Sequence, residues 1–335
     1  MINNNLSTKA YILERLRKTP GAFVSGTKMG EALGISRVAV WKAVKILESL
    51  GYPIEDNDKG YRLPDPEAGD FLYPWEFGEK EPMFRHWPST DSTMNRAKEL
   101  ADRGVSGDTV ITAETQTAGR GRHGKSWSSE KGGLFFTLIK RPQTAIAAYS
   151  WITLAVHVAA AKAISRVCGK QALLRWPNDI YINGKKIAGL LSELQGEGDM
   201  LAWITLGLGI NINNPCTAAD SINCKKLAGH PVSRREALLA ILDELEKLQP
   251  LKNKPQELCA LWNQYAEGIG GPVAVVDPQD KASPYQKGHR KTTKKFEDKI
   301  LGKGAFLGIN PQGQGLVKTD AGVAAYIPGL ASFVF

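Results

Sequence analysis

The chain has 335 residues, of which 42% are apolar and 23% are charged. This balance excludes a disordered or fibrous protein and indicates two or three folded domains. The four cysteines are too few for a disulfide scaffold at this length, and because none forms a CxxC pair, neither a zinc ribbon nor a redox dithiol is indicated. Residues 1–9 lack the apolar stretch of a signal peptide. The most apolar run, residues 145–161, is shorter than the roughly 20 residues of a membrane crossing, so we expect a buried helix, no membrane partner and a cytoplasmic location.

The net charge of +9 is concentrated in two segments. Residues 1–63 carry ten Lys/Arg against six Asp/Glu, and residues 279–304 carry eight against three. The remainder of the chain is neutral. A basic surplus on a small terminal domain suits a phosphate-backbone partner.

The amino-terminal segment has the pattern of a helix-turn-helix. Residues 6–18 and 26–33 place apolar side chains at helical spacing. Gly34 then marks a tight turn, and Ser36 is the expected N-cap of a third helix that ends at Leu50. Two helices joined by a glycine turn, the second with a basic outer face, can place that second helix in the major groove of DNA.

Residues 53–63 follow as a strand, a turn and a strand, which predicts a wing, and residues 64–74 read as a linker. The alternative is a three-helix protein-interaction module whose charges are only solvated. Trp41 could contact DNA or pack inward. The predicted DNA-contacting residues are Ser36, Arg37, Lys42 and Lys45.

The densest motif of the chain is GRGRHGKSW, at residues 119–127. Its glycines allow backbone amides to approach a ligand closely, and its two arginines and one lysine are donors for carboxylate or phosphate. The motif is neither a nucleotide P-loop nor a dinucleotide-binding turn. Taken alone, it fits an anion-binding loop and also an RNA-binding Gly/Arg stretch.

Three further segments are apolar strands that end in polar residues. They are WPSTDSTMN (87–95), RWPNDIYINGKKIAGLLSE (175–193) and WITLGLGININ (203–213). Together they indicate one concave site on a sheet face, with a helix over residues 145–167 behind it. Asn183-Gly184 is read as a plain turn.

Taken together, these motifs resemble the biotin protein ligases, in the longer form that is also the biotin-operon repressor. The resemblance runs in order through GYRLP, DST (91–93), ETQTAGRGRHGKSW (114–127), WPND (176–179), KIAG (186–189) and GLGIN (207–211). It implies an α/β (α+β) protein with a winged helix-turn-helix (1–65), a mixed-sheet catalytic domain (66–270) and a small SH3-like β-barrel (271–335). The expected barrel strands are residues 271–276, 300–309, 315–319, 324–328 and 331–335, with a basic insertion at 278–297.

The resemblance also implies a reaction in two steps. Biotin reacts with ATP and Mg²⁺ to give biotinyl-5′-AMP, and a lysine of the biotin carboxyl carrier protein of acetyl-CoA carboxylase then takes the biotin. The Mg²⁺ is expected to come with ATP, and no protein metal ligand is assigned. The adenylate is the expected corepressor, which favours a homodimer on operator DNA.

The motifs carry residue roles over by position. Lys186, Arg120 and Arg122 are the expected catalytic residues. The expected biotin contacts are Ser92, Thr93, Met94, Gln116, Arg120, Gly121, Arg122 and Lys186. The expected nucleotide contacts are Arg120, Arg122, Trp127, Arg175, Asn178, Asp179 and Asn211.

Three features depart from the family pattern. Arg175 stands where lysine is usual, His123 and Lys125 stand where arginine is frequent, and residues 278–297 are inserted. The insertion is read as a solvated loop, or as a contact with DNA or an acidic carrier. The competing functions are a non-catalytic biotin-sensing transcription factor and a lipoate-type ligase fused to an unrelated regulator. Lys186 and the arginine pair favour the enzyme, because a sensor needs no cations aimed at a phosphate displacement.

Overall fold

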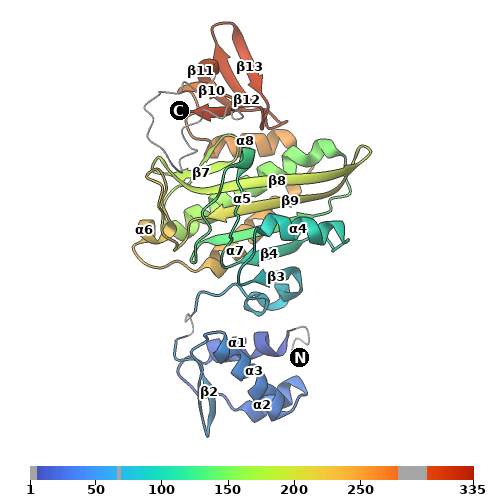
Figure 1. Ribbon diagram of the computed structural model, residues 1–335, viewed down its shortest axis with the longest axis vertical. Helices are drawn as coiled ribbons and strands as arrows, with labels where there is room; N and C mark the ends of the chain where they lie inside the picture. Colours follow the sequence, from blue (N-terminus) through green and yellow to red (C-terminus); the bar gives the residue numbers. More distant parts are fainter. Residues whose placement is uncertain (1–5, 66–68, 278–299) are drawn as a thin grey trace. The chain divides into compact units, whose positions relative to one another are not determined.

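The computed structural model describes residues 6–65, 69–277 and 300–335 (Figure 1). The chain forms two compact units, one of Met1–His86 with Ser233–Arg235 and one of Trp87–Val232 with Glu236–Phe335. The predicted basic insertion at residues 278–297 lies outside the described residues.

The first unit begins with three helices, α1 (Thr8–Lys18), α2 (Gly26–Leu33) and α3 (Arg37–Ser49). Gly34 ends α2 at a φ of +66°, a conformation that glycine adopts without strain, and so permits the tight turn into α3. Each helix starts at a serine whose hydroxyl accepts a backbone hydrogen bond, which satisfies one free amide of the first turn. These serines are Ser7, Ser25 and Ser36.

The wing is a two-stranded antiparallel ribbon of β1 (Glu55–Asn57) and β2 (Gly60–Arg62). Val24 and Tyr61 exchange two backbone hydrogen bonds, 2.7 and 2.9 Å long, which fasten the wing to the entry of α2. The apolar sides of the helices and the wing share one core, whose fully buried members include Ile12, Leu13, Leu16, Val40, Val44, Leu47 and Leu63. The predicted winged helix-turn-helix is therefore confirmed.

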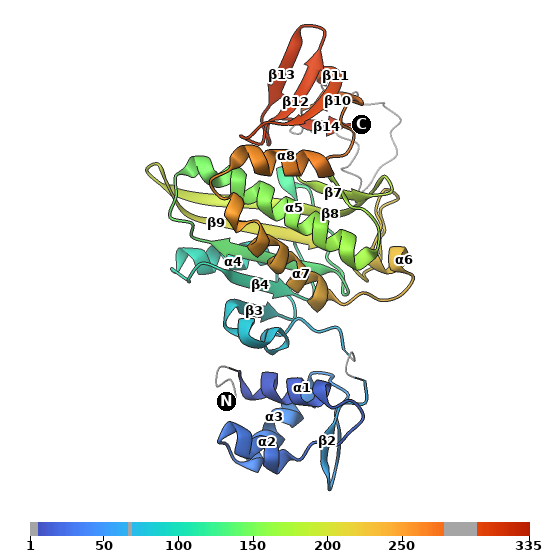
Figure 2. The same ribbon diagram turned by 180° about the vertical axis from the view of Figure 1, so that it is seen from behind.

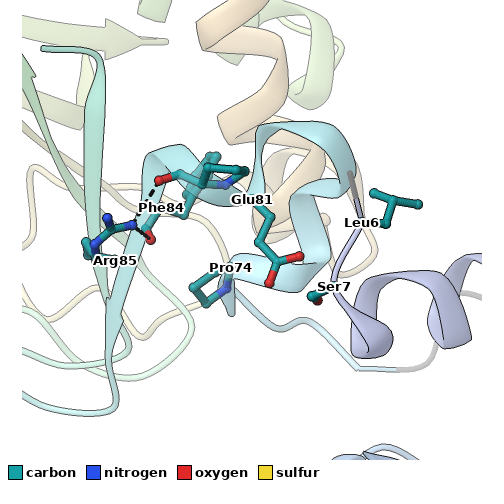
Figure 3. A pocket seen from close by; sticks show the side chains of 7 residues that line it. Leu6, Ser7, Pro74, Glu81, Phe84 and Arg85 are labelled. Atoms are coloured by element: carbon teal, nitrogen blue, oxygen red, sulfur yellow. Dashed lines mark hydrogen bonds between the residues drawn. The ribbon is translucent and has the colours of Figure 1, made fainter. Parts of the chain in front are cut away.

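Beyond the predicted linker, this unit continues into a kinked 3-10 segment, η1 (Pro74–Met83). Figure 3 shows a pocket beside it, in which the guanidinium of Arg85 donates to the carbonyl oxygens of Pro82 (2.9 Å) and Phe84 (2.7 Å). No residue of the sequence motifs lines this pocket, which is formed by Leu6, Ser7, Pro74, Glu81, Pro82, Phe84 and Arg85. This pocket is therefore separate from the residues that the sequence motifs predict to form a site.

The second unit is built on a central sheet. Its strands, in spatial order, are β4 (Thr109–Ala113), β5 (Leu134–Lys140), β9 (Met200–Ile210), β8 (Lys185–Glu197), β7 (Asp179–Ile182) and β6 (Leu173–Arg175). Neighbours in this order are antiparallel. A parallel bridge between Thr90 and Gln116 makes the arrangement mixed, as predicted. β3 (Phe84–Trp87) spans the boundary between the two units.

Helices cover both faces of this sheet (Figures 1 and 2). One face carries α5 (Tyr149–Cys168), α7 (Arg234–Lys247) and α8 (Pro255–Tyr265), and the other carries α4 (Thr93–Asp102). A short helix, α6 (Cys224–Ala228), precedes α7. In the described chain α5 alone is long and apolar enough to cross a membrane, but 67% of its apolar window is buried inside the protein. It is the buried core helix that the sequence predicts.

The carboxy-terminal strands form a separate five-stranded antiparallel sheet, in the order β13-β12-β11-β10-β14. Their bounds are β10 (Pro272–Val276), β11 (Ile300–Ile309), β12 (Gly315–Thr319), β13 (Gly322–Tyr326) and β14 (Ser332–Val334). The fourth strand starts two residues earlier than predicted, because it pairs with β12 from Gly322 onward. Trp176 anchors this sheet to the central one, since its Nε1 donates to the Gly313 carbonyl (3.0 Å) and its ring stacks near Phe333.

Candidate active site

The chemistry-bearing motifs meet where β8 and β9 lie side by side. Gly189 of β8 is paired with Gly209 of β9, and the indole of Trp127 lies over both. A Cβ on Gly209 would stand 2.4 Å from the indole Nε1, which no real contact allows. The glycines of the KIAG and GLGIN motifs are therefore required here, because the Trp127 ring of the GRGRHGKSW loop packs directly against their backbone atoms.

Gly189 also marks the centre of the site. A Cβ at this position would lie 3.3 Å from the Trp127 ring, 3.4 Å from Asp179 Oδ1 and 3.7 Å from Lys186 Cε. Lys186 Nζ is 2.7 Å from Asp179 Oδ2, and both side chains are about one-quarter exposed (28% and 24%). An aromatic ring, a carboxylate and an ammonium group therefore surround the place where Gly189 lacks a side chain, which we call the opening around Gly189.

Two polar atoms at this opening are buried without a hydrogen-bond partner in the described structure. They are Asp179 Oδ1 and Trp127 Nε1. Burying such atoms unpaired is costly, so their presence points to a ligand or bound water as the missing partner.

The GRGRHGKSW loop closes on itself and reaches toward this opening. Gly121 N donates to the Lys125 carbonyl (2.7 Å), and Trp127 N donates to the Gly119 carbonyl (2.9 Å). His123 turns the loop at a φ of +55°. The backbone geometry therefore fixes a compact turn that presents the two arginine side chains.

Both arginines are held by oxygen acceptors on the sheet. Arg120 Nη2 lies 3.2 Å from the Glu193 carboxylate, and Arg122 Nη1 donates to Asn178 Oδ1 (3.1 Å). Burial lowers the pKa of Arg122, while the nearby Asp179 opposes this shift. An arginine stays charged in a protein, so the loop places one cation at Asn178, next to Asp179, and a second at Glu193 of β8.

A second polar group lies at the start of α4. Gln116 Oε1 accepts from the backbone amide of Thr93 (2.7 Å) and from its hydroxyl (3.1 Å), and Gln116 Nε2 donates to Ser129 Oγ (2.8 Å). Thr137 in turn donates to Thr93 Oγ1 (2.9 Å). The donors and acceptors of this group are thereby fixed in direction.

Ser92 and Met94 complete this group. Ser92 is buried and caps α4, with its hydroxyl accepting from Met94 N (3.2 Å). The Met94 sulfur lies over β9, where a Cβ on Gly207 would stand 2.6 Å from it. Four of the five residues predicted to contact biotin outside the loop are thus neighbours, namely Ser92, Thr93, Met94 and Gln116, while the fifth, Lys186, lies on β8 beside Asp179.

Two of the predicted nucleotide contacts are held elsewhere. Arg175 forms an ion pair with Glu267 (2.7 Å), and its guanidinium lies 3.5 Å from the centroid of the Tyr181 ring. Asn211 is buried, and its side-chain oxygen accepts from Asn214 (3.0 Å). These contacts hold both side chains within the fold, and their predicted role toward the nucleotide stays a prediction.

The sequence reasoning missed Glu193 and Ser129, which hold Arg120 and Gln116. Both lie within or next to the quoted motifs, but only the fold shows their partners. It also passed over His157, a lone polar residue in the apolar α5, whose Nε2 lies 3.2 Å from the Asp179 carbonyl oxygen.

On the helix-turn-helix, Arg37 and Lys42 are exposed on α3, and Ser36 is its cap. Trp41 is 47% exposed, so it does not pack inward. Lys45 is engaged by Glu48 (2.7 Å) and by Asp56 of the wing (3.0 Å), which raise its pKa. The predicted role of Lys45 toward DNA would therefore require breaking these two ion pairs.

Comparison with known proteins connects the two units to known functions. Residues 87–211 match the model of the Biotin/lipoate A/B protein ligase family, and residues 8–62 match an HTH domain. The bifunctional ligase/repressor BirA of Bacillus subtilis is 35% identical over 280 residues, which cover 77% of this chain and 84% of that protein. BirA of Escherichia coli is 34% identical over 198 residues, or 57% of this chain and 60% of that protein.

Among solved structures, a biotin protein ligase from Aquifex aeolicus in complex with biotin and ATP has a TM-score of 0.59 and 26% identity, covering 75% of this chain and 98% of that one. The chain therefore belongs to the biotin/lipoate A/B protein ligase family, as one of its members that combine a ligase with a DNA-binding domain.

Proposed function

We propose that this chain is a biotin protein ligase and biotin-responsive repressor whose adenylation site is the opening around Gly189. The observation that carries the assignment is the meeting of Trp127, Asp179 and Lys186 at that glycine, with Arg122 of the loop held by the neighbouring Asn178. The B. subtilis and E. coli relatives are named as bifunctional ligase/repressors, and the A. aeolicus relative was solved with biotin and ATP.

Biotin would bind at the start of α4. Its ureido ring presents both donors and an acceptor, and Ser92, Thr93 and Gln116 offer polar groups of both kinds. Met94 lies next to them as an apolar contact. Because neighbouring side chains already orient this group, little further ordering is required on binding.

The cations of the site would act on the reacting oxygens. Arg120 and Lys186 are now paired with carboxylates and Arg122 with an amide oxygen, positions that the biotin carboxylate and the ATP phosphates can take over. A biotin carboxylate oxygen attacks the α-phosphorus, the bond from that phosphorus to the bridging oxygen breaks, and pyrophosphate leaves. These cations neutralise the charge that develops during the displacement.

In the second step, the uncharged amine of the carrier lysine attacks the carbonyl carbon of biotinyl-5′-AMP. AMP leaves, and an amide bond remains. We take the carrier to be the biotin carboxyl carrier protein of acetyl-CoA carboxylase.

The residues at the opening fit Mg²⁺ arriving with ATP. Asp179 has a buried carboxylate oxygen without a partner, and Asn178 offers an amide oxygen next to it. Oxygen donors of this kind suit Mg²⁺, which commonly takes one or two carboxylates together with substrate phosphates. When bound, the metal supplies positive charge to the phosphates. The described residues contain no cluster of three acidic, histidine or cysteine side chains.

For repression, we propose that the adenylate-bound chain forms a homodimer and presents two helix-turn-helix units to a two-fold operator in the cytoplasm. Dimeric proteins of this class read half-sites about one helical turn apart. An adenylate that keeps the Arg120 loop ordered would link biotin supply to this pairing.

Biotin-dependent exchange of pyrophosphate into ATP tests the adenylation assignment. We expect exchange with biotin but not with lipoate, and a large loss in Lys186→Ala and Arg120→Ala. If the folded protein binds biotin and gives no exchange, the non-catalytic sensor is the correct function instead.

A further inference from the structure

His157 is a buried titratable residue for which the proposed reaction has no use. It lies in the middle of α5 and is 1% exposed. Its Nδ1 accepts a hydrogen bond from Trp262 Nε1 (3.2 Å), and its Nε2 lies 3.2 Å from the backbone carbonyl oxygen of Asp179. An indole N–H can only donate, so the single proton of the neutral ring sits on Nε2 and is donated to Asp179.

Burial keeps the ring in this neutral form. It lowers the pKa of His157 to about 4, against the opposing influence of Asp179. The imidazole is therefore a fixed donor and acceptor at neutral pH. A phenylalanine or leucine would fill the same apolar space, so the polar ring calls for an explanation beyond packing.

The hydrogen-bonded series Trp262–His157–Asp179 ends, on one side, at the proposed reaction site. The residue whose carbonyl accepts from His157 is Asp179, whose carboxylate holds Lys186 Nζ at 2.7 Å. Asp179 begins β7, at the point where that short strand leaves the WPND turn. The hydrogen bond from His157 therefore fixes the backbone from which the Asp179 carboxylate projects.

The other end is the carboxy-terminal sheet. Trp262 belongs to α8 and is fully buried. The side chain of the next residue, Asn263, accepts a hydrogen bond from Ile309 N (2.9 Å) and donates one to the Ile309 carbonyl (3.2 Å). Cys259 Sγ, also on α8, donates to the same carbonyl (3.0 Å). The position of α8, and with it the Trp262 indole, is thus tied to β11.

We propose that His157 is a positioning residue for adenylation, which fixes the Asp179 backbone so that its carboxylate places Lys186, and which connects that placement to the docking of the carboxy-terminal sheet on α8. This inference rests on the proposed role of Lys186. His157 touches no substrate, and its action passes through Asp179.

The test compares His157→Phe, which removes both polar atoms, with His157→Gln, which can restore a donor toward Asp179. Ile164→Ala is the matched control, because Ile164 is equally buried on the same helix, seven residues beyond His157. For each variant, thermal unfolding and the kcat and KM of biotin-dependent ATP–pyrophosphate exchange are measured at a temperature where the variant is folded.

We expect His157→Phe to lower kcat about tenfold with the KM for biotin within about twofold, because a displaced catalytic group impairs the chemical step. His157→Gln should recover most of this loss, and Ile164→Ala should lower only the melting temperature. If His157→Phe and Ile164→Ala have the same kcat at matched stability, the positioning role is wrong. Should His157→Phe fail to fold, Trp262→Phe is the milder substitution, because it removes only the hydrogen bond to His157 Nδ1. We expect Trp262→Phe to lower kcat, and an unchanged kcat would contradict the proposal.

A double-mutant cycle shows whether the effect passes through Asp179. In an Asp179→Asn background, His157→Phe should cost less than about twofold in kcat, since the placement of Lys186 is already lost. A full tenfold loss in that background overturns the proposed route. Lys186→Ala distinguishes failure of the proposed adenylation site from failure of the positioning role. If Lys186→Ala leaves exchange intact, the proposed adenylation site is wrong. If Lys186→Ala abolishes exchange while His157→Phe keeps the parent kcat, only the positioning role of His157 is wrong.

Discussion

The ligase site and α3, the second helix of the helix-turn-helix and here called the recognition helix, both present cations. The surroundings of these cations differ. At the ligase site Arg120 and Lys186 are paired with carboxylates on the sheet and Arg122 with an amide oxygen. On α3, Arg37 and Lys42 are exposed to solvent. A single small substrate requires charges fixed in place before it binds, whereas the phosphates of DNA attract mobile charges through counterion release. A single substitution at the ligase site should therefore cause a large loss of adenylation rate, whereas one on α3 should cause only a small loss of DNA affinity.

The largest effect is expected for Lys186→Ala. Removing a preorganised cation from a displacement costs about 100-fold or more in rate. Exchange of pyrophosphate into ATP measures this loss, and Lys185→Ala is the neighbouring control, because Lys185 is exposed and has no partner assigned at the site. Equal rates for the two variants would remove Lys186 from the mechanism.

Gly209→Ala should come next. The added methyl would stand 2.4 Å from the Trp127 indole, so the loop must leave the sheet and carry its arginines away from the site. We expect a loss of about tenfold or more in exchange, because small displacements of catalytic groups are costly. Gly184→Ala, at a turn where φ is +68° and a Cβ meets nothing within 4 Å, controls for backbone strain without a clash against the loop. An exchange rate in Gly209→Ala equal to that of the parent protein would contradict this account.

On α3, a single substitution should change DNA affinity only modestly. Lys42→Ala is expected to weaken DNA binding at low salt and to lower the slope of log affinity against log salt by about one. Titration with a labelled duplex at several salt concentrations measures it. An unchanged slope would place Lys42 away from the phosphates.

Lys45→Ala should have the smallest effect on DNA binding. Its ammonium is shared between Glu48 and Asp56, so it releases few phosphate counterions, and exposed ion pairs of this type contribute little to stability. We expect DNA affinity within about twofold of the parent in the same titration. A loss as large as that of Lys42→Ala would show that DNA breaks both ion pairs.

Local sequence signals predicted the helix-turn-helix well. Ser36 and Gly34 act through their immediate neighbours, as a cap and a left-handed turn, so their effect could be read without the fold. The short apolar strands of the carboxy-terminal sheet were also found, with small shifts at their ends, because pairing partners decide where a strand begins.

What the sequence could not provide were the partners of each charge. Arg175 lies beside WPND, yet its ion pair is with Glu267, 92 residues further along the chain. Glu193 lies within a quoted motif, but its contact with Arg120 depends on how the loop folds back over β8. Such long-range pairs follow from packing, and no local spacing encodes them.

The most direct test of the ligase site is to incubate the protein with biotin and ATP, without any carrier protein, and to identify what remains bound. The account predicts close to one equivalent of biotinyl-5′-AMP per chain by mass spectrometry, and almost none in Lys186→Ala. Biotin retained unchanged by the folded parent protein, with no pyrophosphate released, would contradict it.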